Sequence, residues 1–229
     1  MSQSFIGGLL IIAVLTGCTA AVPIKVMPKE QPGQLTEWSN GTPTIISKQG
    51  DIIVAIQPLV KHFNFKEKPS FVIRVSNKGR SKFTFSTENI SAHYGFSKLQ
   101  VYDYDYLVKE AEKARKKKEF DAMMYALAGG LNSMNAAMGT PTAVSPNMHM
   151  QMAQASSNEA KTGYEYAMKE ISGDILKMDT VRAGESYGGL IKIQPLSEIV
   201  KEANFSNPIQ ISVDVKGTTH KFTMNLGQL

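Results

Sequence analysis

The 229-residue chain has a single cysteine, Cys18, so it cannot form an intramolecular disulfide. The apolar run Phe5–Val14 near its start is shorter than the roughly 20 residues that a membrane-spanning helix needs. The formal net charge of +5 is too small an excess to indicate a nucleic-acid partner by itself. These absences exclude a disulfide framework, argue against a spanning helix at the N-terminus, and favour a globular protein that does not bind nucleic acid.

The apolar run has instead the length of a signal-peptide core, which is roughly 7–15 residues. It is followed by Leu15, Thr16, Gly17 and Cys18. An ordinary cleavage site has small residues at positions −1 and −3, and here a leucine occupies position −3. The four residues before the run also lack the Lys or Arg that usually opens an export signal. The length of the apolar run nevertheless predicts an export signal over residues 1–17, with a cleavage site that differs from the ordinary one.

The segment Leu15–Cys18 resembles the lipobox of bacterial lipoproteins. The resemblance implies that Cys18 becomes the first residue and carries lipid on its sulfur and an acyl chain on its amine. Thr19 stands where an aspartate would imply retention at the inner membrane, so the resemblance implies an outer-membrane anchor facing the periplasm. Each buried lipid methylene contributes roughly 0.8 kcal/mol, so such an anchor would be permanent. The alternative is that Phe5–Val14 is a buried element and Cys18 a core thiol.

Residues 18–43 contain four prolines among mostly polar residues. Prolines favour extended, semi-rigid linkers. We therefore predict a lipidated N-terminus and Pro-rich tether over residues 18–43, with the only tryptophan, Trp38, docked on the domain that follows.

From residue 44 onward, short segments alternate apolar and polar residues and are separated by Gly or Asn turns. Such alternation gives each strand one core face and one solvent face. The predicted strands are 45–46, 52–56, 71–75, 82–86, 96–102, 190–193, 209–215 and 222–226. We predict a mainly β fold over residues 44–229, an antiparallel immunoglobulin-like β-sandwich. The segments FVIRVSNKG, FTFSTENI and VRAGESYGGLIKI resemble small immunoglobulin-like domains of envelope lipoproteins, and this resemblance carries no active site.

Residues 104–178 interrupt the strand pattern. Apolar residues recur there at helical spacing over Phe120–Met138 and again over Tyr164–Met178. A Gly- and Pro-containing break over 139–146 separates the two stripes. We predict a two-helix hairpin inserted at about 104–178, with its tip near 139–147.

The segment Ala122–Gly139 has no charged residue. One interpretation is that the two stripes cover each other and the sandwich. The other is a docking surface for a partner or a membrane, because small residues allow close approach and methionines adapt to different surfaces. We expect the choice to depend on how many of five residues contact the sandwich, namely Phe120, Met124, Leu131, Ile171 and Ile175.

Two further motifs carry alternative chemistry. A soft-ligand cluster of thioethers and an imidazole suits Cu(I), and it comprises Met148, His149, Met150 and Met152. The pentapeptide Gly184–Gly188 matches G-x-S-x-G around Ser186, and Asp214 and His220 follow in hydrolase order. That motif needs a strand before the serine and a helix after it, whereas a turn and then a strand are predicted here.

We therefore expect a membrane-anchored periplasmic lipoprotein without enzymatic activity or cofactor. Its expected role is that of a binding or structural subunit of an envelope complex for secretion, transport or surface assembly. Its expected partners are the membrane, through the lipid on Cys18, and envelope proteins. A copper-handling lipoprotein is the alternative, and an envelope hydrolase is a weaker one.

Overall fold

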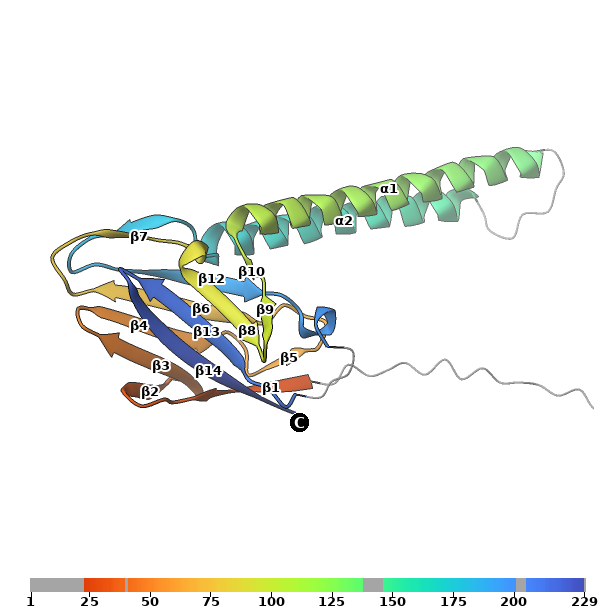
Figure 1. The fold of residues 1–229 in the computed structure, drawn as a ribbon. Coiled ribbons are helices and arrows are strands. Elements are labelled where there is room, and N and C mark those ends of the chain that lie inside the picture. Colours follow the sequence, from red (N-terminus) through yellow and green to blue (C-terminus); the bar gives the residue numbers. More distant parts are fainter. Residues whose placement is uncertain (1–22, 40, 138–145, 201–204, 229) are drawn as a thin grey trace, which may run out of the picture.

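The structure is a computed structural model that describes residues 23–39, 41–137, 146–200 and 205–228. Two six-stranded antiparallel sheets face each other, and a helical hairpin projects from one of them (Figure 1). Sheet A has the order β5 (His62–Asn64), β1 (Pro23–Lys29), β14 (Thr218–Gln228), β13 (Ile209–Val215), β8 (Ile90–Tyr94) and β9 (Ser97–Leu99). Sheet B has the order β10 (Val101–Tyr102), β12 (Ser186–Ile193), β6 (Ser70–Asn77), β4 (Ile52–Pro58), β3 (Thr42–Gln49) and β2 (Gln34–Ser39).

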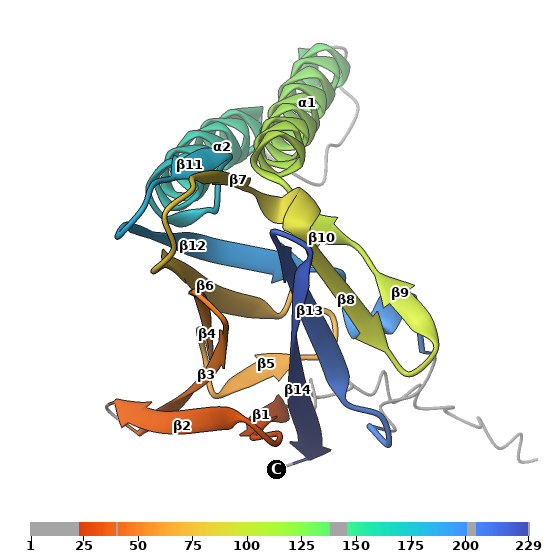
Figure 2. The ribbon, with the colours of Figure 1, turned by 60° about the vertical axis from the view of Figure 1, so that its left-hand side comes forward.

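A third, two-stranded sheet pairs β7 (Phe83–Phe85) with β11 (Asp179–Val181) near the base of the hairpin (Figure 2). Two 3-10 turns, η1 (Thr87–Asn89) and η2 (Leu196–Glu198), complete the sandwich. The predicted antiparallel β-sandwich with an inserted hairpin is confirmed.

The core lies between the inner faces of sheets A and B. Side chains that alternate along each strand fill it, and Phe71, Ile191 and Phe222 are almost completely buried there. The clearest hairpin, β13 and β14, turns at Lys216 and Gly217, whose φ angles are 51° and 76°. Two consecutive positive φ angles define the turn whose twist matches that of the flanking strands, which explains the tight connection.

The predicted tether is wrong over most of its length, because β1 and β2 belong to the sandwich. Ile24 in β1 is fully buried, and β1 pairs with β14 from Ile24 to Lys29. β5 pairs only with residues 23–25 of β1, so β1 is an edge strand at Pro28. Proline is tolerated there because it cannot donate a ladder hydrogen bond and none is needed on the open side. Trp38 on β2 is 71% exposed and is not docked on the domain as predicted.

The hairpin consists of α1 (Tyr104–Ala137) and α2 (Pro146–Asp174), inserted between β10 and β11. With 34 residues at 1.5 Å per residue, α1 is about 51 Å long. Only its first turns lie over sheet B, and the rest extends beyond the sandwich (Figures 1 and 2). Neither of these two described helices is long and apolar enough to span a bilayer. The predicted tip, near 139–147, lies largely outside the described residues.

Candidate functional site

The base of the hairpin is fixed to the outer face of sheet B. Leu107 of α1, Ile171 of α2 and Ile175, the first residue after α2, are buried, and they pack against Tyr102 of β10 and Leu190 of β12. This hydrophobic contact, together with the partly buried residues around it, forms the root of the hairpin. Two of the five residues that were expected to decide its position therefore contact the sandwich, and both belong to the root.

The backbone that leaves α2 lies directly against β12. The Leu176 amide donates a hydrogen bond of 2.9 Å to the Leu190 carbonyl, and Ile175 forms an isolated parallel bridge with Leu190. A Cβ on Gly189 would lie 2.8 Å from the Cα and N atoms of Leu176. Glycine at this position therefore permits the close approach that joins the hairpin to the sheet.

Each helix also makes one ion pair with the sandwich beside the root. Lys68 Nζ lies 2.6 Å from Glu110 Oε1 on α1, and Lys192 Nζ lies 2.7 Å from Glu170 Oε1 on α2. Partly exposed pairs of this kind contribute at most about 1 kcal/mol each. Burial raises the pKa of Tyr102 to about 12, so its hydroxyl stays protonated and the ring serves as packing surface. The root is held mainly by apolar contacts.

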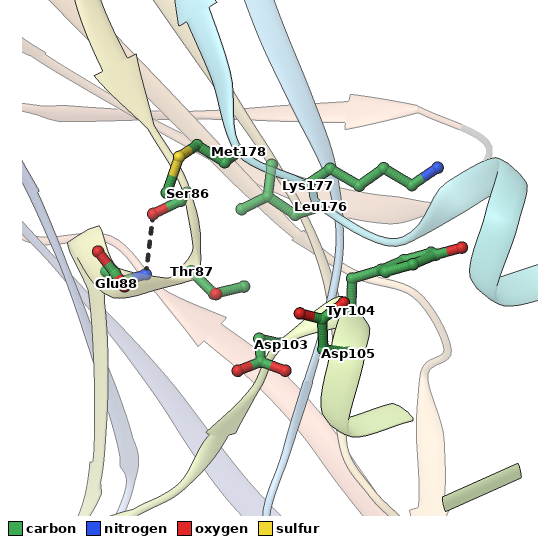
Figure 3. Close-up of a pocket in the computed structure, with 9 residues that line it drawn as sticks. All are labelled: Ser86, Thr87, Glu88, Asp103, Tyr104, Asp105, Leu176, Lys177 and Met178. Carbon is green, nitrogen blue, oxygen red and sulfur yellow. Dashed lines mark hydrogen bonds between the residues drawn. The ribbon is translucent and has the colours of Figure 1, made fainter. Parts of the chain in front are cut away.

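A cavity of about 350 Å³ lies between η1 and the start of α1 (Figure 3). Three of its polar side chains serve the local structure: Ser86 Oγ accepts from the Glu88 amide, Asp103 Oδ1 accepts from the Tyr106 amide, and Lys177 Nζ donates to the Ser172 carbonyl. Among the described residues, no three His, Cys, Asp or Glu side chains are placed to share a metal ion. We therefore interpret this cavity as a consequence of how the helix begins.

Beyond the root, the two helices meet along alanines. Ala122 of α1 and Ala153 and Ala160 of α2 are buried. Ala153, Ala160 and Ala167 are spaced by seven residues, as in a coiled-coil seam. Small side chains bring the helix axes close together and leave no room for large residues between them. The interpretation in which the Phe, Met and Leu stripe of α1 covers α2 is therefore wrong for its described part.

We call the part of α1 and α2 beyond the root the outer hairpin. Its large apolar residues are exposed. Phe120 is 56% exposed and Met124 is 49% exposed, and neither packs against the sandwich core. Four further residues are between 51% and 55% exposed and also lie outside the sandwich core, namely Met123, Leu127, Met148 and Met152. We call these six residues the distal surface. Since single exposed apolar residues are ordinary but contiguous groups mark contact sites, the distal surface is the candidate functional site.

Two sets of predicted site residues fall partly or wholly outside the described part of the chain. Cys18 lies outside the described residues. Met148 and Met152 lie one turn apart on α2, and both are exposed. The side chains of His149 and Met150 lie outside the described part, as does that of Leu131. The structure therefore places half of the proposed copper cluster on one helix face.

The three residues of the hydrolase pattern have separate partners. Ser186 begins β12, so a strand follows it where the hydrolase motif needs a helix. Its Oγ lies 2.7 Å from Ser76 Oγ. His220 is fully buried, with Nδ1 3.0 Å from Ser47 Oγ, while Asp214 bonds to Thr219. The pentapeptide begins in the turn before β12 and continues into that strand, as the predicted turn followed by a strand requires.

No protein-family model matches this chain, and neither a curated protein nor a solved structure is significantly similar to it. The site is therefore argued from its own residues. The distal surface could have been found from the sequence through the seven-residue alanine spacing on α2. That spacing identifies the buried seam and leaves the methionines and Phe120 for the outside.

Proposed function

We propose that this chain is a lipid-anchored, non-enzymatic lipoprotein of the bacterial envelope, on the outer membrane and facing the periplasm. Its helical hairpin docks a protein partner within a secretion, transport or surface-assembly complex. The observation that carries the proposal is the distal surface, which is apolar, exposed and held away from the sandwich. A surface depleted in charge and enriched in Met and Phe has the composition of the core of a protein–protein interface.

The sandwich supplies the rigid base that this role requires. Four residues separate Cys18 from β1, and a fully extended chain advances at most about 3.6 Å per residue. A lipid on Cys18 would therefore hold the sandwich within about 20 Å of the bilayer surface. The root contacts would in turn set the direction of the hairpin relative to sheet B. The anchor and the docking element are thus joined through one packed domain.

The test is a crosslinking pull-down of the lipidated protein from native membranes. The informative variant replaces residues 116–163 by a short Gly-Asn-Gly loop, because the Arg115 guanidinium lies 5.1 Å from the Tyr164 ring and the two chains meet there. This variant keeps the complete root. A defined protein recovered with the natural chain and lost with the shortened hairpin supports the proposal. Equal recovery by both would move the binding surface to the sandwich.

The anchor is tested separately by Cys18→Ser. We expect the variant to leave the membrane fraction and to lose labelling by radioactive palmitate. A membrane-bound, lipid-labelled Cys18→Ser protein would contradict the lipobox prediction.

A second candidate function is Cu(I) handling, which the shared face of Met148 and Met152 favours. It predicts that Cu(I) binding is lost when Met148, Met150 and Met152 are replaced by Leu together. Unchanged binding in that variant would remove this candidate.

A further inference from the structure

The outer face of sheet A is basic. Among the six described strands of this sheet, the only acidic residue is Asp214, which accepts a hydrogen bond from Thr219. The same strands carry four exposed lysines beside buried core residues, namely Lys25, Lys29, Lys98 and Lys221. The hairpin stands on sheet B, on the opposite side of the sandwich. A positively charged sheet face is therefore open to solvent.

Two of these lysines flank an exposed methionine on β1. Met27 is 40% exposed and lies between Lys25 and Lys29, and all three face outward because Ile24 and Val26 are buried. Such an arrangement matches the boundary of a bilayer with anionic lipids. There an apolar side chain enters the headgroup region while the neighbouring ammonium groups contact phosphates.

An exposed aromatic residue lies at one end of the same sheet. Phe96 forms the tip between β8 and β9, and its side chain is fully exposed. Gly95, which precedes it, has a φ of 58°, a conformation that glycine adopts without strain. Lys98 follows in β9. The ring gains no burial from the fold, whereas insertion at a bilayer interface would bury it.

The Phe96 tip and the start of β1 lie at the same end of sheet A (Figures 1 and 2). Ile209 of β13 pairs with both Tyr94 of β8 and Met224 of β14. Met224 pairs in turn with Pro28 of β1. From that row, β8 continues toward its tip and β1 runs back toward its first residue. Three strand spacings of about 4.8 Å place the tip about 14 Å across the sheet from β1.

We propose that this part of sheet A contacts the anionic phospholipid headgroups of the membrane that holds the lipid anchor. We call it the basal face, and it comprises Lys25, Met27, Lys29, Phe96 and Lys98. The inference rests on the proposed anchor, since a lipid on Cys18 would keep the start of β1 near the bilayer. Sheet B makes no equivalent contact, because a flat surface meets the hairpin first. The basal contact thus leaves the hairpin on the side away from the bilayer.

The two apolar residues of the basal face favour lipid over a soluble acidic polymer. The lysines alone would attract either, but only a bilayer offers an apolar phase to Phe96 and Met27. Each lysine near an anionic membrane strengthens binding roughly fivefold, and salt screens the attraction. The contact is therefore weak by itself, and it orients the sandwich without replacing the anchor.

The first test is cosedimentation with vesicles of the mature chain, residues 18–229, carrying Cys18→Ser so that no anchor contributes. At about 0.1 M salt, where the Debye length is about 10 Å, we expect binding to phosphatidylethanolamine with phosphatidylglycerol. Binding should be absent with phosphatidylcholine alone and lost at about 1 M salt. Replacing Lys25, Lys29 and Lys98 by Gln should weaken it by at least roughly tenfold. The matched control removes equal charge from exposed positions on α1 and should have less than about a twofold effect, namely Lys116→Gln, Lys117→Gln and Lys118→Gln.

The second test concerns the aromatic tip. Phe96→Ser should weaken vesicle binding roughly tenfold, since insertion of the ring removes apolar area from water. In a chain with Trp38→Phe, the further change Phe96→Trp should give tryptophan emission that shifts to shorter wavelength when the anionic vesicles are added. Phe120→Trp in the same background is the matched control, because Phe120 is exposed on α1, and its emission should not shift.

Three results would overturn the inference: no binding to the anionic vesicles, equal losses in the two lysine variants, or an emission shift with Phe120→Trp and none with Phe96→Trp. Binding to soluble polyphosphate without binding to vesicles would identify the occupant as an acidic polymer and would also overturn it. A chain that fails on vesicles, while the natural protein is held in membranes through Cys18, would refute the basal contact and leave the proposed anchor intact.

Discussion

The sandwich and the hairpin use their large apolar residues in opposite ways. In the sandwich, phenylalanines and isoleucines from both sheets are buried together, as Phe71 and Phe222 show. In the outer hairpin, alanines are buried and Phe120 is exposed. The comparison teaches that the same residue type stabilises the fold in one region and is available for binding in the other. The predictions below test this division, beginning with the largest expected effect.

The sharpest comparison is between two phenylalanines. Phe222→Ala should lower the free energy of unfolding by about 3–5 kcal/mol, since it leaves a cavity in a closed core. Phe120→Ala should change it by less than about 0.5 kcal/mol, because the ring is half exposed. Urea denaturation monitored by circular dichroism measures both. Similar losses in the two variants would show that the outer hairpin is packed more tightly than the structure indicates.

Two glycines compare the root with the outer hairpin. Gly189→Ala should destabilise the protein by about 1–3 kcal/mol, because the new Cβ meets the Leu176 backbone. Gly163→Ala, in α2 with nothing within 4 Å of the added Cβ, should stabilise the helix by about 0.5–1 kcal/mol. Thermal unfolding of the two variants provides the measurement. A stabilising Gly189→Ala would refute the close approach at the root.

The pH dependence of stability should come from the sandwich. Burial lowers the pKa of His220 below its ordinary value of 6.5, so the native state favours the neutral imidazole. The unfolded chain takes up a proton first as the pH falls. The contribution is therefore complete above about pH 6.5 and is lost as the pH falls from there to the lower pKa of the native state.

The free energy of unfolding in urea, measured between pH 7.5 and 5 (a range that includes the unperturbed histidine pKa of about 6.5), should show this decline. His220→Asn should flatten the profile at the cost of overall stability, and His62→Gln, a change at an exposed histidine, should not. A profile that His220→Asn leaves unchanged would assign the decline to other groups.

The smallest expected effect concerns the ion pairs at the root. In a double-mutant cycle with Lys192→Met and Glu170→Gln, the coupling energy should be about 0.2–1 kcal/mol and should fall with added salt. A coupling well above this range would mean that the ion pairs, and not the apolar contacts, hold the hairpin to sheet B.

Local periodicity explains why most strands could be predicted. The alternation along 209–215 and 222–226 is complete, and both segments are strands of the core. The strand β1 was missed because its prolines obscure the pattern, and proline is acceptable there only because β5 is short. That condition belongs to the neighbour of β1 and is not visible in the sequence of β1 itself.

The sequence could predict where along the chain the candidate site lies, but not which of its side chains are exposed. The lack of charge over Ala122–Gly139 and the methionine cluster indicated the outer hairpin as a surface of interest. A pattern that counts Phe, Met and Ala alike as apolar does not show which residues face the other helix, and only the seven-residue alanine spacing on α2 distinguishes them. The contact between helices selects alanine, since the smallest side chains allow the closest approach of the backbones.

By itself, the sequence determined that alternating segments form a β-sandwich and that a helical hairpin interrupts it, because both depend on patterns within a few residues. The lipobox resemblance at Cys18 is likewise a property of the sequence alone. Only the tertiary structure decided that β1 and β2 join the sandwich, that Gly189 admits the end of α2, and that the distal surface stays uncovered. These features depend on which segment lies against which, and burial is settled only when distant parts of the chain meet.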